Sequence, residues 1–278
     1  MAMSEQKIEA LPQLLHAVVQ IAIDAGAAIL EVYHQEPSAD QVVAKADDSP
    51  LTLADLASHS YILAELAKIS DLPILSEESI SVSWQERAQW QRYWLIDPLD
   101  GTKEFIKRNG EFTVNIALIE GQRAILGVVY APVLQRVYCA AQGQGAQRIE
   151  VVDNLPQVPQ PIHVSPRAAT WRVVGSRSHG ADAMNDFMQF LGRVDLLAMG
   201  SSLKLCLVAE GAADLYPRLA PTSEWDTAAA QCVVEQAGGE VLTEQLQPLL
   251  YNSKESILNP HFIVCGARDP AWTRFFLN

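Results

Sequence analysis

Two aspartates at the end of an apolar run are well suited to bind a cation. The segment Trp94–Phe105 reads WLIDPLDGTKEF, which places Asp97 and Asp100 three positions apart with a proline between them. Two carboxylates held this close repel each other unless a cation lies among them, and hard oxygen ligands of this kind suit Mg²⁺. Asp, Pro and Gly are also the ordinary residues of a surface turn, so the segment alone leaves both interpretations open.

Paired aspartates can also supply a covalent nucleophile, as in the phosphatase motif DxDGT. That motif needs its two carboxylates two positions apart on one face of an extended strand end. Asp97 and Asp100 are three positions apart. The spacing therefore argues against an aspartate that attacks phosphorus itself.

Three further acidic segments strengthen the case for a metal site. Asp55 lies in TLAD and Asp226 in EWDTAA, each where a helix is expected to begin, and Glu77 lies in SEES after a strand-like run. An acid near a helix start more often caps the helix or interacts with its dipole. Taken with the first two aspartates, however, these acids supply enough oxygen ligands for two or more Mg²⁺ ions.

The elements that must position these acids can be read from the spacing of apolar residues. Helical spacing predicts a long helix from Leu11 to Val32 and a second helix over 52–68. Short apolar runs at 73–75 and 93–96 predict strands that end in carboxylates. The region from Phe112 to Ile149 is rich in Val, Ile and Tyr and is broken by glycines, which predicts an antiparallel meander.

The second half of the chain alternates between strands and helices. Four prolines between Asp153 and Pro166 interrupt any regular pattern, so we expect a domain boundary there. We then expect strands at 172–175, 194–198 and 213–216 and helices at 182–191, 202–210 and 227–237. The last helix should end at Gly238 through a glycine C-cap.

Composition limits the classes of function. The chain of 278 residues has 20 Lys and Arg against 33 Asp and Glu, a formal charge of −13, which disfavours binding to nucleic-acid polymers or anionic membranes. Charged residues interrupt the apolar stretches, so we predict no transmembrane segment. The N-terminus does not read as a secretory signal, and the four scattered cysteines fit a reducing compartment. We expect a cytoplasmic protein and leave open peripheral association with the cytoplasmic side of the inner membrane, as well as the oligomeric state.

The ordered motifs resemble the inositol monophosphatase superfamily of Mg²⁺-dependent, lithium-sensitive phosphatases. Its two signatures look like Asp97–Phe105 and Trp225–Gly239. Within that superfamily, the stretches 97–119 and 200–218 are most similar to the bacterial CysQ-type 3′(2′),5′-bisphosphate nucleotidases. The resemblance implies an α+β fold, a layered αβαβα sandwich of the inositol monophosphatase and fructose-1,6-bisphosphatase type. We expect an N-terminal α+β half (1–155) with most metal ligands and a C-terminal α/β half (156–278) with Asp226 and the substrate contacts.

The resemblance also implies roles for matching positions. The metal ligands would be Glu77, Asp97, the Leu99 carbonyl, Asp100 and Asp226, which together would hold two or three Mg²⁺ ions. Asp55, Glu77 and Thr102 would be catalytic, with Thr102 paired to Asp55 to orient and help deprotonate the attacking water. The substrate would contact Gly101, Thr102, His179, Ser201, Ser202, Lys204, Arg218 and Asp226. Without the resemblance, Lys204 is equally well explained as a solvated helix residue, Arg218 as part of a surface ion pair and His179 as a capping residue.

The implied reaction is Mg²⁺-dependent hydrolysis of the 3′-phosphate of adenosine 3′,5′-bisphosphate to AMP and phosphate, which would clear a by-product of sulfate assimilation. Activity on the sulfated precursor, 3′-phosphoadenosine 5′-phosphosulfate, is implied as well. One alternative is an inositol or sugar monophosphate phosphatase with the same metal chemistry. Another is a catalytically silent nucleotide-binding protein, against which the intact set of acids argues.

Overall fold

A computed structural model of the chain describes residues 11–35, 42–44, 50–79, 82–166, 169–175 and 181–276. Within these residues the larger sheet has eight strands in the order β10-β8-β7-β6-β5-β4-β3, with β9 on β8. The strands are β3 (Ile74–Ser76), β4 (Arg92–Asp100), β5 (Thr113–Glu120), β6 (Arg123–Ala131), β7 (Arg136–Ala141), β8 (Ala146–Val152), β9 (Leu155–Pro156) and β10 (Gln160–Ile162). Strand β3 runs parallel to β4. Strands β5 to β8 form the antiparallel meander predicted over Phe112–Ile149, and β4 pairs antiparallel with β5 at its edge.

The smaller sheet has five strands among the described residues, in the order β12-β11-β13-β15-β14. They are β11 (Trp171–Gly175), β12 (Val194–Ala198), β13 (Leu215–Arg218), β14 (Glu240–Thr243) and β15 (Phe262–Cys265). Strand β11 pairs in parallel with β12 and β13, whereas β15 pairs antiparallel with β13 and β14. A separate hairpin joins β1 (Val42–Ala44) to β2 (Pro50–Thr52).

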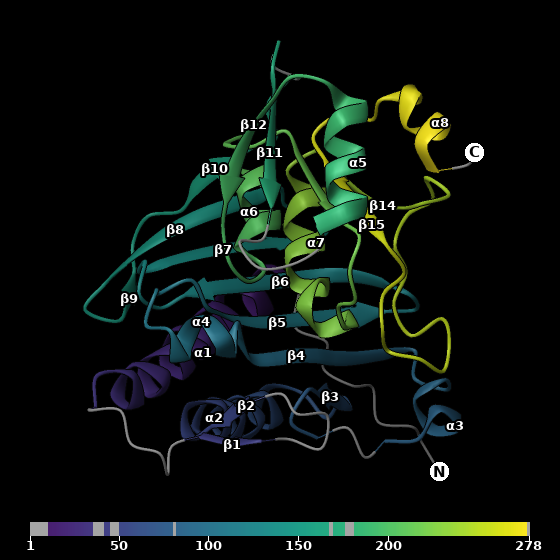
Figure 1. Ribbon diagram of the computed structural model, residues 1–278. Coiled ribbons are helices and arrows are strands. Elements are labelled where there is room, and N and C mark those ends of the chain that lie inside the picture. The colour runs from purple at the N-terminus through teal and green to yellow at the C-terminus, as the bar shows by residue number, and fades with distance from the viewer. Residues whose placement is uncertain are drawn as a thin grey trace.

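Helices cover both sheets (Figure 1). The α-helices are α1 (Leu11–Tyr33), α2 (Leu53–Ile69), α3 (Trp84–Arg87), α4 (Thr102–Ile106), α5 (Ala181–Leu191), α6 (Leu203–Ala209), α7 (Ala228–Gln236) and α8 (Thr273–Phe276), and two short 3₁₀ helices are η2 (Glu224–Asp226) and η3 (Pro270–Trp272). The helices predicted from spacing are therefore present, with ends that differ from the prediction by one or two residues.

Alternation of side chains along the strands explains the layers. In β4, Trp94 and Ile96 pack with α1 and α2, whereas Tyr93 and Leu95 lie on the opposite face, which packs against α6 and α7. In β11, Val174 belongs to that same central core, and its neighbour Val173 packs against Phe187 of α5. The order is therefore helices, sheet, helices, sheet, helix, which confirms the predicted αβαβα sandwich (Figure 1).

Helix α1 adds to one argument from the sequence. Asp24 and Glu31 interrupt its apolar run, as expected, yet its 23 residues are long and apolar enough, by length and composition, to cross a membrane. In the fold, buried residues such as Val18, Ala22 and Ile29 pack this helix against the large sheet. The core helix of a folded domain has the same composition, and its packing here accounts for the apolar character of α1.

The proline-rich segment between Asp153 and Pro166 is more regular than predicted. It forms β9 and β10, which pair with β8. Proline is tolerated at such positions because an edge strand has one side without a partner strand. The chain passes from the large sheet to the small one between Ile162 and Trp171, so β10 still belongs to the first sheet; the division into halves at 155/156 stays a prediction.

Two helix ends beside the acidic segments follow local rules. Thr52 caps α2 in a capping box with Asp55, in which the Thr52 main-chain N–H donates to Asp55 Oδ2 at 2.7 Å. Helix α7 ends as predicted, because Gly238 adopts φ +91° and its N–H donates to the Glu235 carbonyl. The Gly239 N–H reaches the Val234 carbonyl at 2.9 Å, which completes a Schellman motif.

Candidate functional site

A β-bulge brings Asp97 and Asp100 to the same side of the large sheet. Asp97 pairs with Asn115 of β5 and Asp100 pairs with Thr113, so three steps along β4 correspond to two along β5. In a regular strand, residues three positions apart point to opposite faces. The extra residue of the bulge restores the same face for both acids, and Ser58 of α2 supports it by donating its hydroxyl to the Pro98 carbonyl at 2.7 Å.

Asp226 reaches the same place from the second half of the chain. It ends the short helix η2, and its Oδ2 accepts a hydrogen bond from the Ser223 main-chain N–H at 2.9 Å. One carboxylate oxygen each from Asp97, Asp100 and Asp226 lie within 4.8 Å of one another. Three of the five predicted metal ligands therefore form one cluster, although Asp226 is far from the other two in sequence.

The electrostatics of this cluster are those of a cation site. Burial, and then the carboxylates of Glu77, Asp100 and Asp226, raise the pKa of Asp97 well above its ordinary value. Burial and Asp100 likewise raise the pKa of Asp226 to about 8. A positive charge among these oxygens relieves both effects, and three hard carboxylate donors fit a divalent cation such as Mg²⁺.

Glu77 and the Leu99 carbonyl, the other two predicted ligands, lie beside the cluster. Glu77 directly follows β3, and its main-chain N–H donates to the Ile96 carbonyl at 3.3 Å. Its carboxylate contributes to the raised pKa values of Asp97, Asp100 and Asp226. The Leu99 carbonyl accepts a hydrogen bond from Thr102 Oγ1 at 3.4 Å.

The side chains of Asp55 and Thr102 are in contact, as the resemblance implies. Asp55 also caps helix α2, which was the alternative role for an acid near a helix start. Its Oδ2 accepts from the main chain and hydroxyl of Thr52, the latter at 2.5 Å, whereas its Oδ1 faces Thr102 Oγ1 at 3.4 Å. Asp55 is 1% exposed. The capping box therefore orients one oxygen of this carboxylate toward Thr102.

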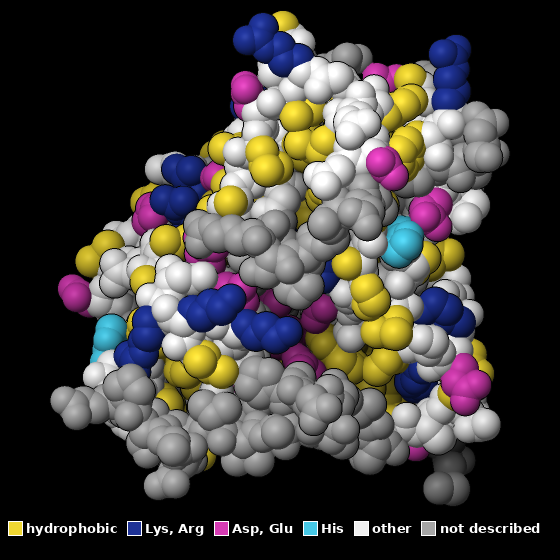
Figure 2. Space-filling model, viewed as in Figure 1, with side chains coloured by type: hydrophobic (Ala, Val, Ile, Leu, Met, Phe, Trp, Pro, Cys, Tyr) yellow, Lys and Arg dark blue, Asp and Glu magenta, His cyan; other side chains and the backbone are white. Residues whose placement is uncertain are grey.

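The predicted substrate residues Gly101, Ser201, Ser202, Lys204 and Arg218 line one pocket together with Asp100 and Asp226. Gly101 adopts φ +95°, and an added Cβ would meet the Glu111 carbonyl at 3.2 Å, so this position favours glycine. In the space-filling view, acidic side chains gather in a recess at the centre of one face, with Lys and Arg side chains beside them (Figure 2). His179 lies outside the described residues.

Two cations, Lys204 and Arg218, line this pocket, and burial rules out the alternative proposed for Lys204. Lys204 is 7% exposed, so it is not a solvated helix residue, and its Nζ donates to the Ser201 carbonyl at 2.5 Å. Burial lowers the pKa of Lys204 to about 8 while Asp100 opposes this, so the amine stays protonated near neutral pH. Arg218 donates to the Pro221 carbonyl at 2.8 Å.

Several residues at the site were not found from the sequence. Glu104, Tyr216, Thr222 and Phe262 also line the pocket, and they come from four separate elements or loops. The sequence predicted Thr113 and Asn115 only as strand residues. In the structure, the Thr113 hydroxyl contacts both the Asp100 carboxylate and the Asn115 side chain. The pairing of β4 with β5 is the signal that could have found these last two, because it places them opposite the two aspartates.

The chain is similar to bacterial bisphosphate nucleotidases over most of its length. The 3′(2′),5′-bisphosphate nucleotidase CysQ of Shigella flexneri is 50% identical over 252 residues, which cover 90% of this chain and 99% of that protein. The nucleotidase CysQ of Haemophilus influenzae is 34% identical over 270 residues, covering 95% and 96%.

Solved structures show the same likeness. The crystal structure of CysQ from Bacteroides thetaiotaomicron, described as a bacterial member of the inositol monophosphatase family, has 40% identity and a TM-score of 0.81, covering 92% of this chain and 98% of that one. An inositol monophosphatase from Thermotoga maritima shares the fold, with a TM-score of 0.73 at 22% identity and coverage of 95% and 94%. A model of the inositol monophosphatase family matches residues 10–269. The chain therefore belongs to the inositol monophosphatase family.

Proposed function

We propose that this protein is a 3′(2′),5′-bisphosphate nucleotidase that hydrolyses the 3′-phosphate of adenosine 3′,5′-bisphosphate to AMP and phosphate. The observation that carries the proposal is the position of Lys204 and Arg218 in the same pocket as Asp100 and Asp226. Cations beside an acidic cluster can bind a second phosphate, which a bisphosphate nucleotide has and inositol phosphate lacks. Relatives of this chain that carry the nucleotidase name support the same substrate. The sulfated analogue has the same 3′-phosphate and is a second proposed substrate.

The metal sites we propose consist of Glu77, Asp97, the Leu99 carbonyl, Asp100 and Asp226, with Mg²⁺ as the ion and two or three ions in total. The clustered carboxylates and their raised pKa values favour binding of divalent cations at this place. When bound, Mg²⁺ neutralises the charge on the phosphate and acidifies water for an in-line displacement.

The chain's own residues account for proton movement and orientation. A water beside Thr102 can pass its proton to Thr102 Oγ1 as the Thr102 hydroxyl passes its own to Asp55 Oδ1, 3.4 Å away. The new bond from the water oxygen to phosphorus forms as the bond from phosphorus to the ribose O3′ breaks. The ribose oxygen then takes a proton from solvent. Gly101 lines the pocket at the start of α4, and a Cβ at this position would meet the Glu111 carbonyl.

The remaining substrate contacts are proposed on charge and position. Lys204 and Arg218 would bind the 5′-phosphate, and Ser201, Gly101 and Thr102 would contact the scissile phosphate through main-chain groups. His179 remains a proposed contact from the resemblance alone. Buried, free cysteines Cys139, Cys206, Cys232 and Cys265 support the proposed cytoplasmic localisation.

Phosphate release from adenosine 3′,5′-bisphosphate tests this proposal, measured with Mg²⁺ and with EDTA for the wild-type chain and for Asp100→Asn. We expect turnover that EDTA abolishes and that Asp100→Asn lowers at least about 100-fold. Circular dichroism of the variant should match the wild type, because the change is isosteric. Binding of the nucleotide without turnover by the wild-type chain would instead support the catalytically silent alternative.

A further inference from the structure

A buried polar cluster that we name the Asp100 support lies directly behind the acidic cluster. It consists of Thr113, Asn115 and Ser202, whose exposed fractions are 0%, 1% and 2%. Thr113 and Asn115 belong to β5 of the large sheet, whereas Ser202 directly precedes α6 in the second half of the chain. The support therefore joins the two halves at the point where Asp100 emerges from the bulge.

The support contacts a single oxygen of Asp100. The Ser202 main-chain N–H donates to Asp100 Oδ2 at 2.5 Å, and Thr113 Oγ1 lies 3.5 Å from the same oxygen. Among the described residues, no hydrogen bond reaches Asp100 Oδ1. Because one oxygen of Asp100 lies within 4.8 Å of oxygens of Asp97 and Asp226, fixing Oδ2 from behind holds the carboxylate in the orientation of that cluster.

With the Asn115 amide in this orientation, the hydroxyls of the Asp100 support carry too few protons to make a hydrogen bond of every contact. Three side-chain contacts link its members: Thr113 Oγ1 to Ser202 Oγ at 2.8 Å, Ser202 Oγ to Asn115 Oδ1 at 2.8 Å and Thr113 Oγ1 to Asn115 Oδ1 at 3.1 Å. With the contact to Asp100, that makes four contacts, but two hydroxyls supply only two protons. In this orientation Asn115 Nδ2 is also buried with no hydrogen-bond partner among the described residues.

Rotating the Asn115 amide by half a turn exchanges its oxygen and nitrogen and removes the deficit. The two N–H groups then donate to Ser202 Oγ and Thr113 Oγ1, Ser202 donates to Thr113, and the Thr113 proton goes to Asp100 Oδ2. All four contacts are then hydrogen bonds. The atom left without a partner is a carbonyl oxygen, which is tolerated in protein interiors more often than a buried N–H donor.

We propose that the Asp100 support is a set of positioning residues that presents Asp100 to the metal ion. The Thr113 hydroxyl and the Ser202 main-chain N–H hold Asp100 Oδ2, and the Asn115 amide directs the Thr113 proton to that oxygen. This inference rests on the role of Asp100 in the proposed function. It also implies that the Ser202 hydroxyl contacts Thr113 and Asn115 inside the protein and does not contact the substrate.

Calorimetric titration with Mn²⁺ or Mg²⁺ alone tests this inference without substrate. We expect Thr113→Val to raise the Kd of the tightest site about 10-fold or more, the range found when hydrogen-bonding partners of metal ligands are removed. Thr113→Ser keeps the hydroxyl and should return the Kd to within about threefold of the wild-type value. Ser202→Ala keeps the main-chain N–H and leaves Thr113 free to donate to Asp100, so its Kd should also stay within about threefold.

Control variants distinguish a failure of this inference from misfolding of a variant and from a failure of the proposed function. Thr243→Val removes a hydroxyl from β14, outside the support, and should leave the Kd unchanged. Melting temperatures in EDTA measure stability without metal, and the increase in melting temperature on adding Mn²⁺ should shrink in Thr113→Val. Asp100→Asn tests the ligand itself.

Each outcome has one interpretation. If Asp100→Asn leaves the Kd unchanged, Asp100 is not a ligand and the proposed metal site fails. If Asp100→Asn abolishes binding but Thr113→Val only lowers the melting temperature in EDTA, the support is structural and this inference fails alone. If Ser202→Ala weakens binding as much as Thr113→Val, the Asn115 oxygen faces the hydroxyls and the proposed proton direction is wrong.

Discussion

Asp97 and Asp100 are separated by an odd number of positions on one strand, yet they face the same side of the sheet. The bulge between them pairs Asp97 with Asn115 and Asp100 with Thr113. The two partners on β5 are two positions apart and share a face, so the acids opposite them share it as well. The position of these two acids in the proposed metal site depends on this irregularity in strand pairing.

Ser58 should contribute to the stability of the bulge. Its buried hydroxyl donates to the Pro98 carbonyl at 2.7 Å, and Ser58→Ala leaves that carbonyl without its partner. We expect the free energy of unfolding to fall by about 1–2 kcal/mol. Urea unfolding in EDTA measures this, with Ser60→Ala on the exposed side of α2 as the matched control. Equal stability of the two variants would show that the hydrogen bond does not support the bulge.

Thr102 should affect turnover. Thr102→Val keeps the shape of the side chain but removes the hydroxyl that lies 3.4 Å from Asp55 Oδ1. If this pair moves the proton of the attacking water, kcat should fall about 100-fold or more while KM changes little. Thr102→Ser should recover most of the activity. A Thr102→Val variant with kcat near that of the wild type would remove Thr102 from the reaction.

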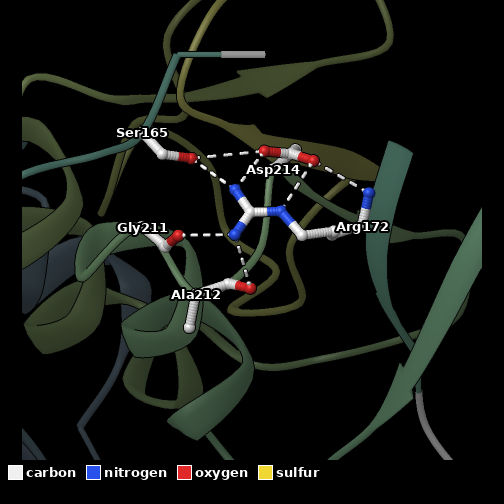
Figure 3. A network of polar contacts seen from close by, with 5 residues as sticks. All are labelled: Ser165, Arg172, Gly211, Ala212 and Asp214. Atoms are coloured by element: carbon white, nitrogen blue, oxygen red, sulfur yellow. Dashed lines mark hydrogen bonds and ion pairs between the residues drawn. The ribbon is translucent and has the colours of Figure 1, made fainter. Parts of the chain in front are cut away.

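Arg172 and Asp214 form a network that should make stability depend on pH. The Arg172 guanidinium donates to both Asp214 oxygens, to the Ser165 hydroxyl and to the carbonyls of Gly211 and Ala212 (Figure 3). Burial alone would raise the pKa of Asp214, but the side-chain and main-chain hydrogen bonds from Arg172 outweigh it and hold this pKa below its ordinary value of 3.8.

A lowered pKa in the folded state means that the ionised Asp214 stabilises the fold above the unfolded pKa, and that this contribution is lost as the pH falls through the folded value. Asp214→Asn should therefore cost about 2 kcal/mol at pH 7, and the difference should shrink below about pH 4. Urea unfolding at several pH values checks this. Glu240→Gln breaks the exposed ion pair with Arg268, 2.8 Å long, and should cost under about 0.5 kcal/mol. A cost of Asp214→Asn that stays constant down to pH 3 would contradict the assigned pKa shift.

Most of the fold could be predicted because its elements carry local signals. Helical spacing predicted α1, and Gly238 predicted the end of α7, because apolar periodicity and glycine in a left-handed conformation are properties of a few neighbouring residues. The proline-rich segment misled the prediction, because whether proline fits a strand depends on whether that strand lies at an edge, as β10 does.

The site could be predicted in part for the same reason. The aspartates at 97, 100 and 226 stand in recognisable motifs, and the structure brings them within 4.8 Å of one another. Asn115 and Phe262 had no such signal, because their positions beside the site follow from strand register and from the packing of distant segments. The burial of Lys204 could not be predicted from the sequence either, because a lysine on a short helix is usually exposed.

The comparison of two substrates tests the central claim most directly. With Mg²⁺ present, kcat/KM should be at least about 100-fold higher for adenosine 3′,5′-bisphosphate than for inositol 1-phosphate, because two charge-assisted contacts to a second phosphate each contribute about 1.5–3 kcal/mol. Arg218→Gln should narrow that ratio by lowering the value for the nucleotide alone. An equal or higher kcat/KM for inositol 1-phosphate would contradict the assignment of a bisphosphate nucleotidase and identify an inositol phosphatase instead.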